Sequence, residues 1–145
     1  AEELNALVRE LKLEANTWLP GARHDIAELL PEFDVFILPS LAEGISNTIL
    51  EAMACGTPVV AARAGALAEN VPLGCGQLCN PHSPHAMARA VQEVFANDPA
   101  ALGRQARRHV EKHHAWDRVV DGLLGHYHAV TGTRMQPVLE EVTHG

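Results

Sequence analysis

Cysteine pairs, long apolar runs and an excess of basic residues are all missing from this sequence. Its three cysteines, Cys55, Cys75 and Cys79, form no Cys-x-x-Cys pair, so we predict neither a disulfide framework nor a structural zinc site, and a reducing, cytoplasmic location. No apolar run approaches the roughly 18 to 20 residues of a membrane-spanning helix. Lys and Arg number 11 against 18 Asp and Glu, for a net charge of −7. This charge argues against binding a nucleic acid over a broad face.

Several common ligand motifs are also absent. The chain has no Gly-x-Gly-x-x-Gly and no Walker A lysine, which argues against the usual dinucleotide-binding and P-loop classes. His109 and His113 lie one helical turn apart, but the glutamate between them, Glu111, is not where the His-Glu-x-x-His zinc pattern needs it. We therefore predict no metal site.

The length and composition indicate one globular domain. The chain has 145 residues, of which 47% are hydrophobic, enough for a single core. It opens without an initiator Met or a basic n-region, and we expect it to be a piece of a longer protein. An amphipathic stripe at residues 4–11 predicts that it begins with a helix. We place the domain at residues 1–130 and expect the remaining segment, 131–145, to be a loose tail because it has no such stripe.

The middle of the chain predicts a strand, a helix and a second strand. Residues 34–39 form an apolar run ended by a proline, the pattern of a strand covered on both faces of a parallel sheet. Residues 48–55 form a helix pattern closed by Gly56, and residues 58–62 a second buried strand. Short segments at 16–20 and 76–80 give weaker strand signals, and helical patterns follow. The fold class expected is α/β, with a short parallel sheet and a helical C-terminal cap.

The loop between the first strand and the helix is the predicted ligand site. Ligands of open parallel sheets bind beyond the carboxyl ends of the strands, where this chain has residues 39–48. The first turn of a helix presents unpaired N–H groups that suit an anion such as a diphosphate. Gly44 permits close approach of a ligand, and the Glu43 carboxylate is a bidentate acceptor for vicinal hydroxyls.

Residues 43–60, Glu-Gly-Ile-Ser-Asn-Thr-Ile-Leu-Glu-Ala-Met-Ala-Cys-Gly-Thr-Pro-Val-Val, closely resemble a known signature. It is that of retaining glycosyltransferases with the GT-B fold, in the family of glycosyl transferases group 1. Two glutamates at the spacing of Glu43 and Glu51 flank the donor site in that family. The resemblance extends from about Asn16 to Tyr127. It implies a Rossmann-like three-layer half of a GT-B fold, with helices on both faces of the sheet.

The resemblance also implies roles for individual residues. Glu43 would be the catalytic residue, hydrogen-bonding the donor sugar, and Glu51 would take the ribose hydroxyls. Ile26 would hold the base through its backbone. The other donor-binding residues would supply backbone N–H groups or lie at the helix start under the diphosphate: Gly44, Ile45, Ser46, Asn47 and Thr48. The implied reaction moves a sugar from a nucleotide diphosphate to an acceptor hydroxyl with retention at the anomeric carbon, needing no metal or other cofactor.

The chain also departs from the family pattern. Residues 64–69 replace a glycine pair followed by Pro-Glu, and the family's basic phosphate-binding pair and acceptor domain precede the region covered. We therefore expect the isolated chain to be inactive, its partner to be a missing N-terminal domain, and any peripheral membrane association to occur through that domain. The segment 40–48 is similar to exopolysaccharide sugar transferases, so we include a role in polysaccharide synthesis.

Alternatives remain open at this level. Thr48 and Glu51 have the spacing of a capping box, and Arg23 and Arg63 fit either a phosphate contact or a surface ion pair. A sugar-nucleotide epimerase has the same fold. The strand at 34–39 is also similar to the central strand of a receiver-like interaction domain, although Pro39 and Ser40 provide no acidic phosphoacceptor at its end.

Overall fold

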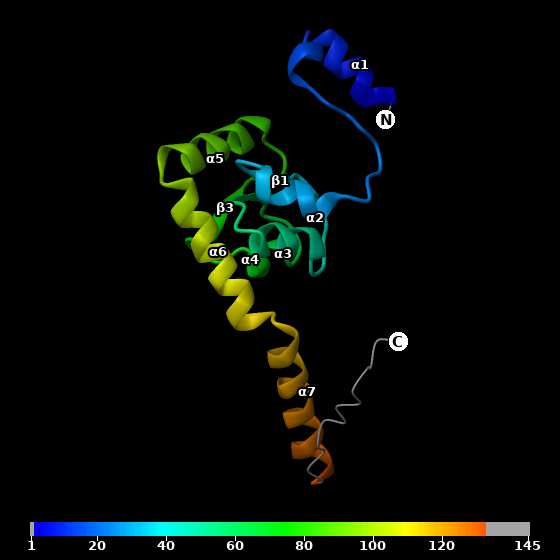
Figure 1. The fold of residues 1–145 in the computed structure, drawn as a ribbon. Coiled ribbons are helices and arrows are strands. Elements are labelled where there is room, and N and C mark those ends of the chain that lie inside the picture. The colour runs from blue at the N-terminus through cyan, green and yellow to red at the C-terminus, as the bar shows by residue number, and fades with distance from the viewer. Residues whose placement is uncertain (1, 133–145) are drawn as a thin grey trace.

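The computed structural model describes residues 2–132, and the rest of the predicted tail, 133–145, lies outside the described residues. Helices alternate with short strands in the middle of the chain and follow one another at its end (Figure 1). The elements are α1 (Glu2–Glu10), η1 (Glu14–Asn16), α2 (Ile26–Leu29), η2 (Leu30–Glu32), β1 (Phe36–Leu38), α3 (Asn47–Ala54), β2 (Val59–Ala62), α4 (Leu67–Asn70), β3 (Gly76–Cys79), α5 (Pro84–Ala96), α6 (Pro99–His113) and α7 (Trp116–Thr131).

The three strands form one parallel sheet in the order β1-β2-β3. Phe36 pairs with Val59, and Val59 in turn pairs with Gly76. All four residues of β2 are buried, as expected for the central strand of a sheet with both faces covered. The predicted strand, helix and strand of residues 34–62 are confirmed, as is the third strand near residue 76.

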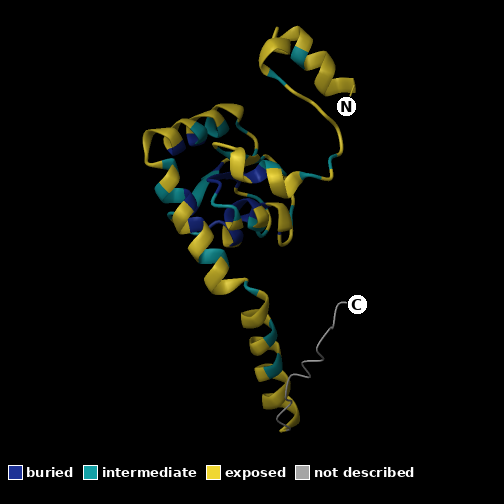
Figure 2. Ribbon diagram, in the orientation of Figure 1, coloured by how far each residue is buried: buried dark blue, intermediate teal, exposed yellow. Residues whose placement is uncertain are grey.

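Helices cover both faces of this sheet, which confirms the three-layer α/β prediction. On one face, side chains from α3, α4 and α6 pack with β1 and β2, among them Met53, Leu67 and Ala106. On the other face, α5 contributes Ala90 and Val94. The buried residues concentrate in the sheet and on the helix faces turned toward it (Figure 2). The hydrophobic core therefore holds the β1–α3–β2 unit on both sides.

The prediction that the first strand is covered on both faces is wrong. β1 is an edge strand of the described sheet, and its side chains at Phe36 and Leu38 are only half-buried. Ile37, on the α5 face, is 42% exposed. It lines an open apolar cleft of about 630 Å³ together with Met87 and Val91 of α5. The predicted strand is confirmed, but within the described residues its Ile37 side is left partly uncovered.

The weak strand signal at residues 16–20 is also not confirmed. Asn16 ends the 3-10 helix η1, and Thr17 adopts an extended conformation with φ −126° and ψ 128°. No strand within residues 2–132 pairs with this segment. An extended segment needs backbone partners to become part of a sheet, and this one finds none among the described residues.

The first and last helices stand away from the core. The predicted amphipathic helix forms as α1, yet it has no buried residue, and α7 has none either. Figures 1 and 2 show both helices extending from the body with mostly exposed surfaces. Their exposed apolar side chains include Leu4 and Leu7 on α1 and Trp116 and Leu123 on α7. No helix in the described part is both long and apolar enough to cross a membrane.

Helices α3 and α6 meet through two glycines. Gly56, just after α3, has φ +80°, and its carbonyl oxygen lies against the Cα of Gly103 on α6. A methyl group at position 103 would overlap that oxygen and approach Pro58 Cδ to 3.6 Å. The close approach brings Ala106 of α6 into the core. A residue without a side chain is therefore needed at position 103.

We expect Gly103→Ala to lower the free energy of unfolding by about 2 kcal/mol. The cost of steric overlap with the Gly56 carbonyl group exceeds the roughly 1 kcal/mol by which alanine stabilises a helix relative to glycine. Gly122→Ala on α7 is the matched control, since a methyl group there meets nothing within 4 Å. It should raise stability by about 0.5 to 1 kcal/mol. Urea unfolding of both variants measures the difference, and a Gly103→Ala chain at least as stable as wild type would contradict this packing.

Candidate functional site

The candidate site lies at the carboxyl edge of the sheet. Because the strands are parallel, the loops that follow Leu38, Ala62 and Cys79 all leave the sheet at the same edge. The first of these loops, residues 39–46, leads directly into α3. The predicted ligand loop and the first turn of that helix are thus side by side at the edge where parallel sheets bind their ligands.

The loop is held by the segment that follows β2. The Ala66 N–H donates to the Glu43 carbonyl oxygen at 3.0 Å, and Asn70 Nδ2 donates to the Gly44 carbonyl oxygen at 3.3 Å. Gly65 has φ +53°, and a methyl group on it would overlap the Glu43 carbonyl oxygen and lie 3.1 Å from Glu43 N. The segment after β2 therefore fixes the backbone of Glu43 and Gly44 in the loop that follows β1.

The first turn of α3 carries free N–H donors. Ser46 is the N-cap residue, but its side chain makes no capping hydrogen bond; its Oγ lies 3.0 Å from Thr48 Oγ1. The N–H groups of Asn47, Thr48 and Ile49 have no acceptor within residues 2–132, and the first helical bond is from Leu50 N–H to the Ser46 carbonyl oxygen. Asn47 and Thr48 are exposed, whereas Ile49 is fully buried, so two of these donors at the positive helix end are accessible to an anion.

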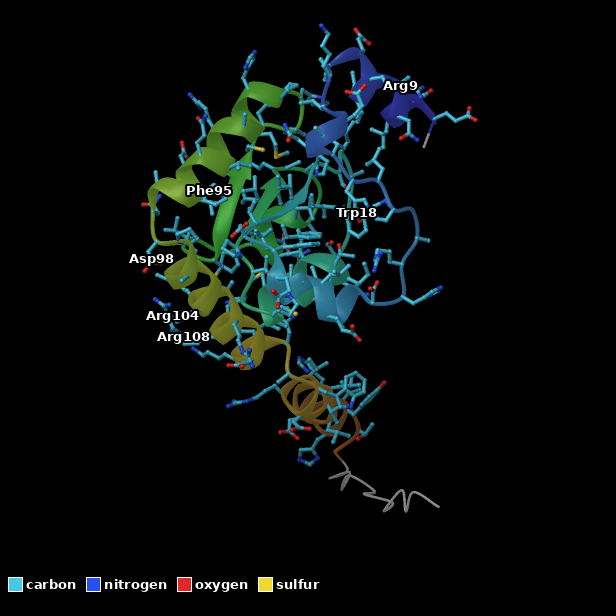
Figure 3. All side chains as sticks on the ribbon, turned by 45° about the horizontal axis from the view of Figure 1, so that its top comes forward. Arg9, Trp18, Phe95, Asp98, Arg104 and Arg108 are labelled. Atoms are coloured by element: carbon cyan, nitrogen blue, oxygen red, sulfur yellow. The ribbon has the colours of Figure 1, made fainter. Side chains whose placement is uncertain are left out.

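Two other helices show what a satisfied N-terminus looks like. On α5, Ser83 Oγ accepts from Ala86 N–H at 3.1 Å. On α6, Asp98 Oδ1 accepts from Ala101 N–H at 3.0 Å. The Asp98 carboxylate also lies 3.6 Å from the Arg104 guanidinium, and both residues lie on the exposed side of α6 (Figure 3). Both helices are closed by a side chain, whereas the start of α3 is left open.

The two glutamates of the motif differ in their surroundings. Glu43 is half-buried in the loop, and Glu51 is exposed on α3. The capping-box alternative for Glu51 is wrong, because α3 begins at Asn47 with Ser46 as its N-cap, which places Thr48 inside the helix. The Glu51 carboxylate forms no hydrogen bond or ion pair with the residues described. It is therefore free to accept hydrogen bonds from a ligand.

Ile26 is not brought into the loop by any described hydrogen bond. It is the first residue of α2, it is 42% exposed, and its carbonyl oxygen accepts from Leu30 N–H. Its assigned contact with the base of the donor stays a prediction.

The open alternative for Arg23 is resolved in favour of an ion pair. Arg23 Nε donates to Asp25 Oδ1 at 2.7 Å, and Nη2 donates to Asp25 Oδ2. This hydrogen bond lowers the pKa of the Asp25 carboxyl and raises that of the guanidinium. The guanidinium carbon lies 5.0 Å from the ring centroid of Trp18. Asp25 thus pairs with Arg23 and does not cap α2 with its side chain.

Sequence reasoning missed the contribution of residues 64–70. It treated this segment only as an altered loop, whereas the structure forms the short helix α4 there, with Leu67 and Asn70 buried. The one available signal was an asparagine between apolar residues, Leu67 and Val71. Its partner, Gly44, is 26 residues away in the chain, so no local pattern indicates the contact.

A family model described as "Glycosyl transferases group 1" matches residues 1–97. Curated relatives named "D-inositol 3-phosphate glycosyltransferase" include one from Mycolicibacterium gilvum, 37% identical over 123 residues, which are 83% of this chain and 28% of the relative. Another, from Acidothermus cellulolyticus, is 39% identical over 132 residues, covering 87% of this chain and 29% of the relative. The chain therefore spans less than a third of the length of these relatives.

Solved structures give the same fold. HepE (Alr3699) of Anabaena in complex with UDP superposes with a TM-score of 0.77 at 27% identity, covering 91% of this chain and 36% of that protein. Sucrose-phosphate synthase of Thermosynechococcus elongatus gives a TM-score of 0.76 at 30% identity, covering 90% of this chain and 34% of that protein. Both similarities extend well beyond the signature segment at residues 43–60.

The open start of α3 can be tested through stability. Ser83→Ala should cost about 1 kcal/mol, because Ser83 caps α5. Thr48→Ala and Glu51→Ala should each change the free energy of unfolding by less than about 0.5 kcal/mol, because neither side chain caps α3. Urea unfolding of the three variants measures this. A loss at Thr48 and Glu51 as large as that at Ser83 would reinstate the capping box.

Proposed function

This chain belongs to the glycosyl transferases group 1 family, and we propose that it forms the nucleotide-sugar-binding part of a longer glycosyltransferase. The donor would bind at the carboxyl edge of the sheet, across residues 43–51. The longer protein would move the sugar to an acceptor hydroxyl with retention at the anomeric carbon. Membership of this family leaves the receiver-like alternative without support.

The observation that carries this proposal is the open N-terminus of α3. Asn47 and Thr48 are exposed and present N–H groups without acceptors among residues 2–132, at the edge of the sheet where ligands bind. A diphosphate supplies several anionic oxygens at the spacing of successive backbone donors, and the helix dipole adds to the attraction. An acidic chain can thus bind a phosphate group without a basic patch.

The two glutamates fit the uncharged parts of the donor. A carboxylate accepts two hydrogen bonds from vicinal hydroxyls but is repelled by phosphate oxygens. The proposal therefore assigns Glu43 to the hydroxyls of the transferred sugar and Glu51 to those of the ribose, with Ile26 beside the base. The free carboxylate of Glu51 and the fixed backbone at Glu43 support this assignment.

We further propose that the reaction needs no bound metal. Charge on the departing diphosphate would be neutralised by backbone donors of this chain and by basic residues of the longer protein. Within residues 2–132, no group of three or more His, Cys, Asp or Glu side chains is arranged to hold a metal ion. The donor base is left open, although HepE of Anabaena, solved with UDP and with UDP-glucose, makes uridine nucleotides the first ligands to test.

The proposed partner is the remainder of the same protein, which would hold the acceptor. Three apolar surfaces of this chain lack a covering layer in the described part: the edge strand β1, the stripe on α1 and the exposed side of α7. Clusters of exposed apolar side chains are typical of interfaces. They support packing against the part of the longer protein that this chain does not span. For the cellular role, we propose a cytoplasmic enzyme of polysaccharide synthesis.

The donor assignment predicts different losses for two variants of the longer protein. Glu51→Gln should weaken binding of both the nucleotide sugar and the free nucleoside diphosphate by about ten- to a hundredfold, because it removes charge-assisted hydrogen bonds worth about 1.5 to 3 kcal/mol. Glu43→Gln should weaken binding of the nucleotide sugar but leave binding of the free nucleoside diphosphate nearly unchanged. Calorimetric titration of both ligands into both variants measures the pattern.

The control variant is Glu93→Gln, since Glu93 is exposed on α5 and outside the proposed site. It should bind both ligands as wild type does. Wild-type affinity in both motif variants would remove the assignment of Glu43 and Glu51 to the donor.

A further inference from the structure

A buried asparagine outside the signature segment is bound to the donor loop. Asn70, the last residue of α4, is 6% exposed. Its Nδ2 donates to the carbonyl oxygen of Gly44 at 3.3 Å. Burying an amide is costly unless it is hydrogen-bonded. The contact with the loop provides that compensation, and it joins two segments that are distant in the sequence.

A second link holds the neighbouring peptide group. The Ala66 N–H donates to the Glu43 carbonyl oxygen at 3.0 Å, and Gly65 lies so close to that oxygen that a side chain there would overlap it. Two consecutive carbonyl groups of the loop, those of Glu43 and Gly44, therefore point toward residues 65–70. Among the described residues, no backbone hydrogen bond joins residues 39–45 to α3, and the first such bond is from Leu50 N–H to the Ser46 carbonyl oxygen.

Holding the carbonyl groups also orients the N–H groups of the same peptides. In a trans peptide the N–H points opposite to the C=O, and no described peptide bond is cis. The N–H groups of Gly44 and Ile45 must then point away from α4. Neither N–H donates a hydrogen bond to any residue between 2 and 132, and both residues are exposed. Like the N–H groups of Asn47 and Thr48 on α3, they are free to donate to a ligand.

We propose that Asn70 is a positioning residue for donor binding: its bond to Gly44 turns the N–H of Ile45 toward the anionic oxygens of a nucleoside diphosphate. This inference rests on the proposed function and adds a residue to it. Asn70 does not touch the donor. It acts through the peptide between Gly44 and Ile45, while Ala66 acts in the same way on the peptide between Glu43 and Gly44.

Two substitutions in the longer protein separate this role from simple packing. Asn70→Asp keeps the size of the side chain but replaces the donor with a carboxylate that repels the Gly44 carbonyl. Asn70→Leu keeps approximate size without any polar group. Each should bind the nucleoside diphosphate at least fivefold more weakly than wild type, while binding of the parent nucleoside stays within twofold. The ligand is whichever of UDP, GDP and ADP wild type binds most tightly in calorimetry, and nucleoside binding is followed by ligand-detected NMR.

Thr57→Val is the matched control for loss of a buried hydrogen bond. Thr57 is 2% exposed, and its Oγ1 donates to the Leu30 carbonyl oxygen at 2.5 Å, at the opposite end of α3 from the donor loop. This variant should lower the thermal unfolding midpoint but bind the diphosphate and the nucleoside as wild type does. It shows whether destabilisation alone reduces affinity.

The possible failures are distinguishable. If both Asn70 variants bind the diphosphate within twofold of wild type, the role of Asn70 is overturned while the proposed function stands. If they lose nucleoside and diphosphate binding equally, Asn70 is only structural and the inference also falls. If wild type binds none of the three diphosphates, the proposed function and this inference fall together.

Discussion

The parallel pairing of β1 with β2 is the constraint on which the site depends. A parallel pair cannot be joined by a tight turn, so the chain must cross over, and here it does so through α3. The crossover places the first turn of α3 at the carboxyl edge of the sheet, beside the end of β1. The core side chains Ile49 and Met53 hold the helix against the strands, so the exposed free donors of Asn47 and Thr48 have a fixed position.

The net charge of the chain makes the local nature of this site important. At −7, the chain as a whole repels a diphosphate, and a carboxylate 4 Å from a phosphate charge would cost about 4 kcal/mol at an effective dielectric constant of about 20. Binding must therefore come from backbone donors, and the carboxylates must face hydroxyl groups. The open end of α3 and the tethered loop of residues 43–45 meet the first requirement. Assigning Glu43 and Glu51 to sugar hydroxyls meets the second.

The sequence predicted those parts of the fold that are determined locally. The β1–α3–β2 unit follows from an apolar run, a helix closed by Gly56 and a second apolar run, and all three signals lie within residues 34–62. Burial of Ile37 and pairing of residues 16–20 were predicted wrongly because both depend on neighbours that the described chain does not supply. Asn70 was missed because its role arises only from a contact with Gly44 across 26 residues. The identity of the N-cap, Ser46 and not Thr48, likewise needed backbone geometry.

The central claim is that backbone N–H groups at the start of α3 bind the diphosphate of the donor. It is tested most directly by following the backbone amide resonances of the isotopically labelled longer protein while a nucleoside diphosphate or its parent nucleoside is added. We predict that the amide protons of Asn47 and Thr48 move downfield with the diphosphate and stay in place with the nucleoside. Unchanged resonances at both residues in the presence of saturating diphosphate would contradict the claim.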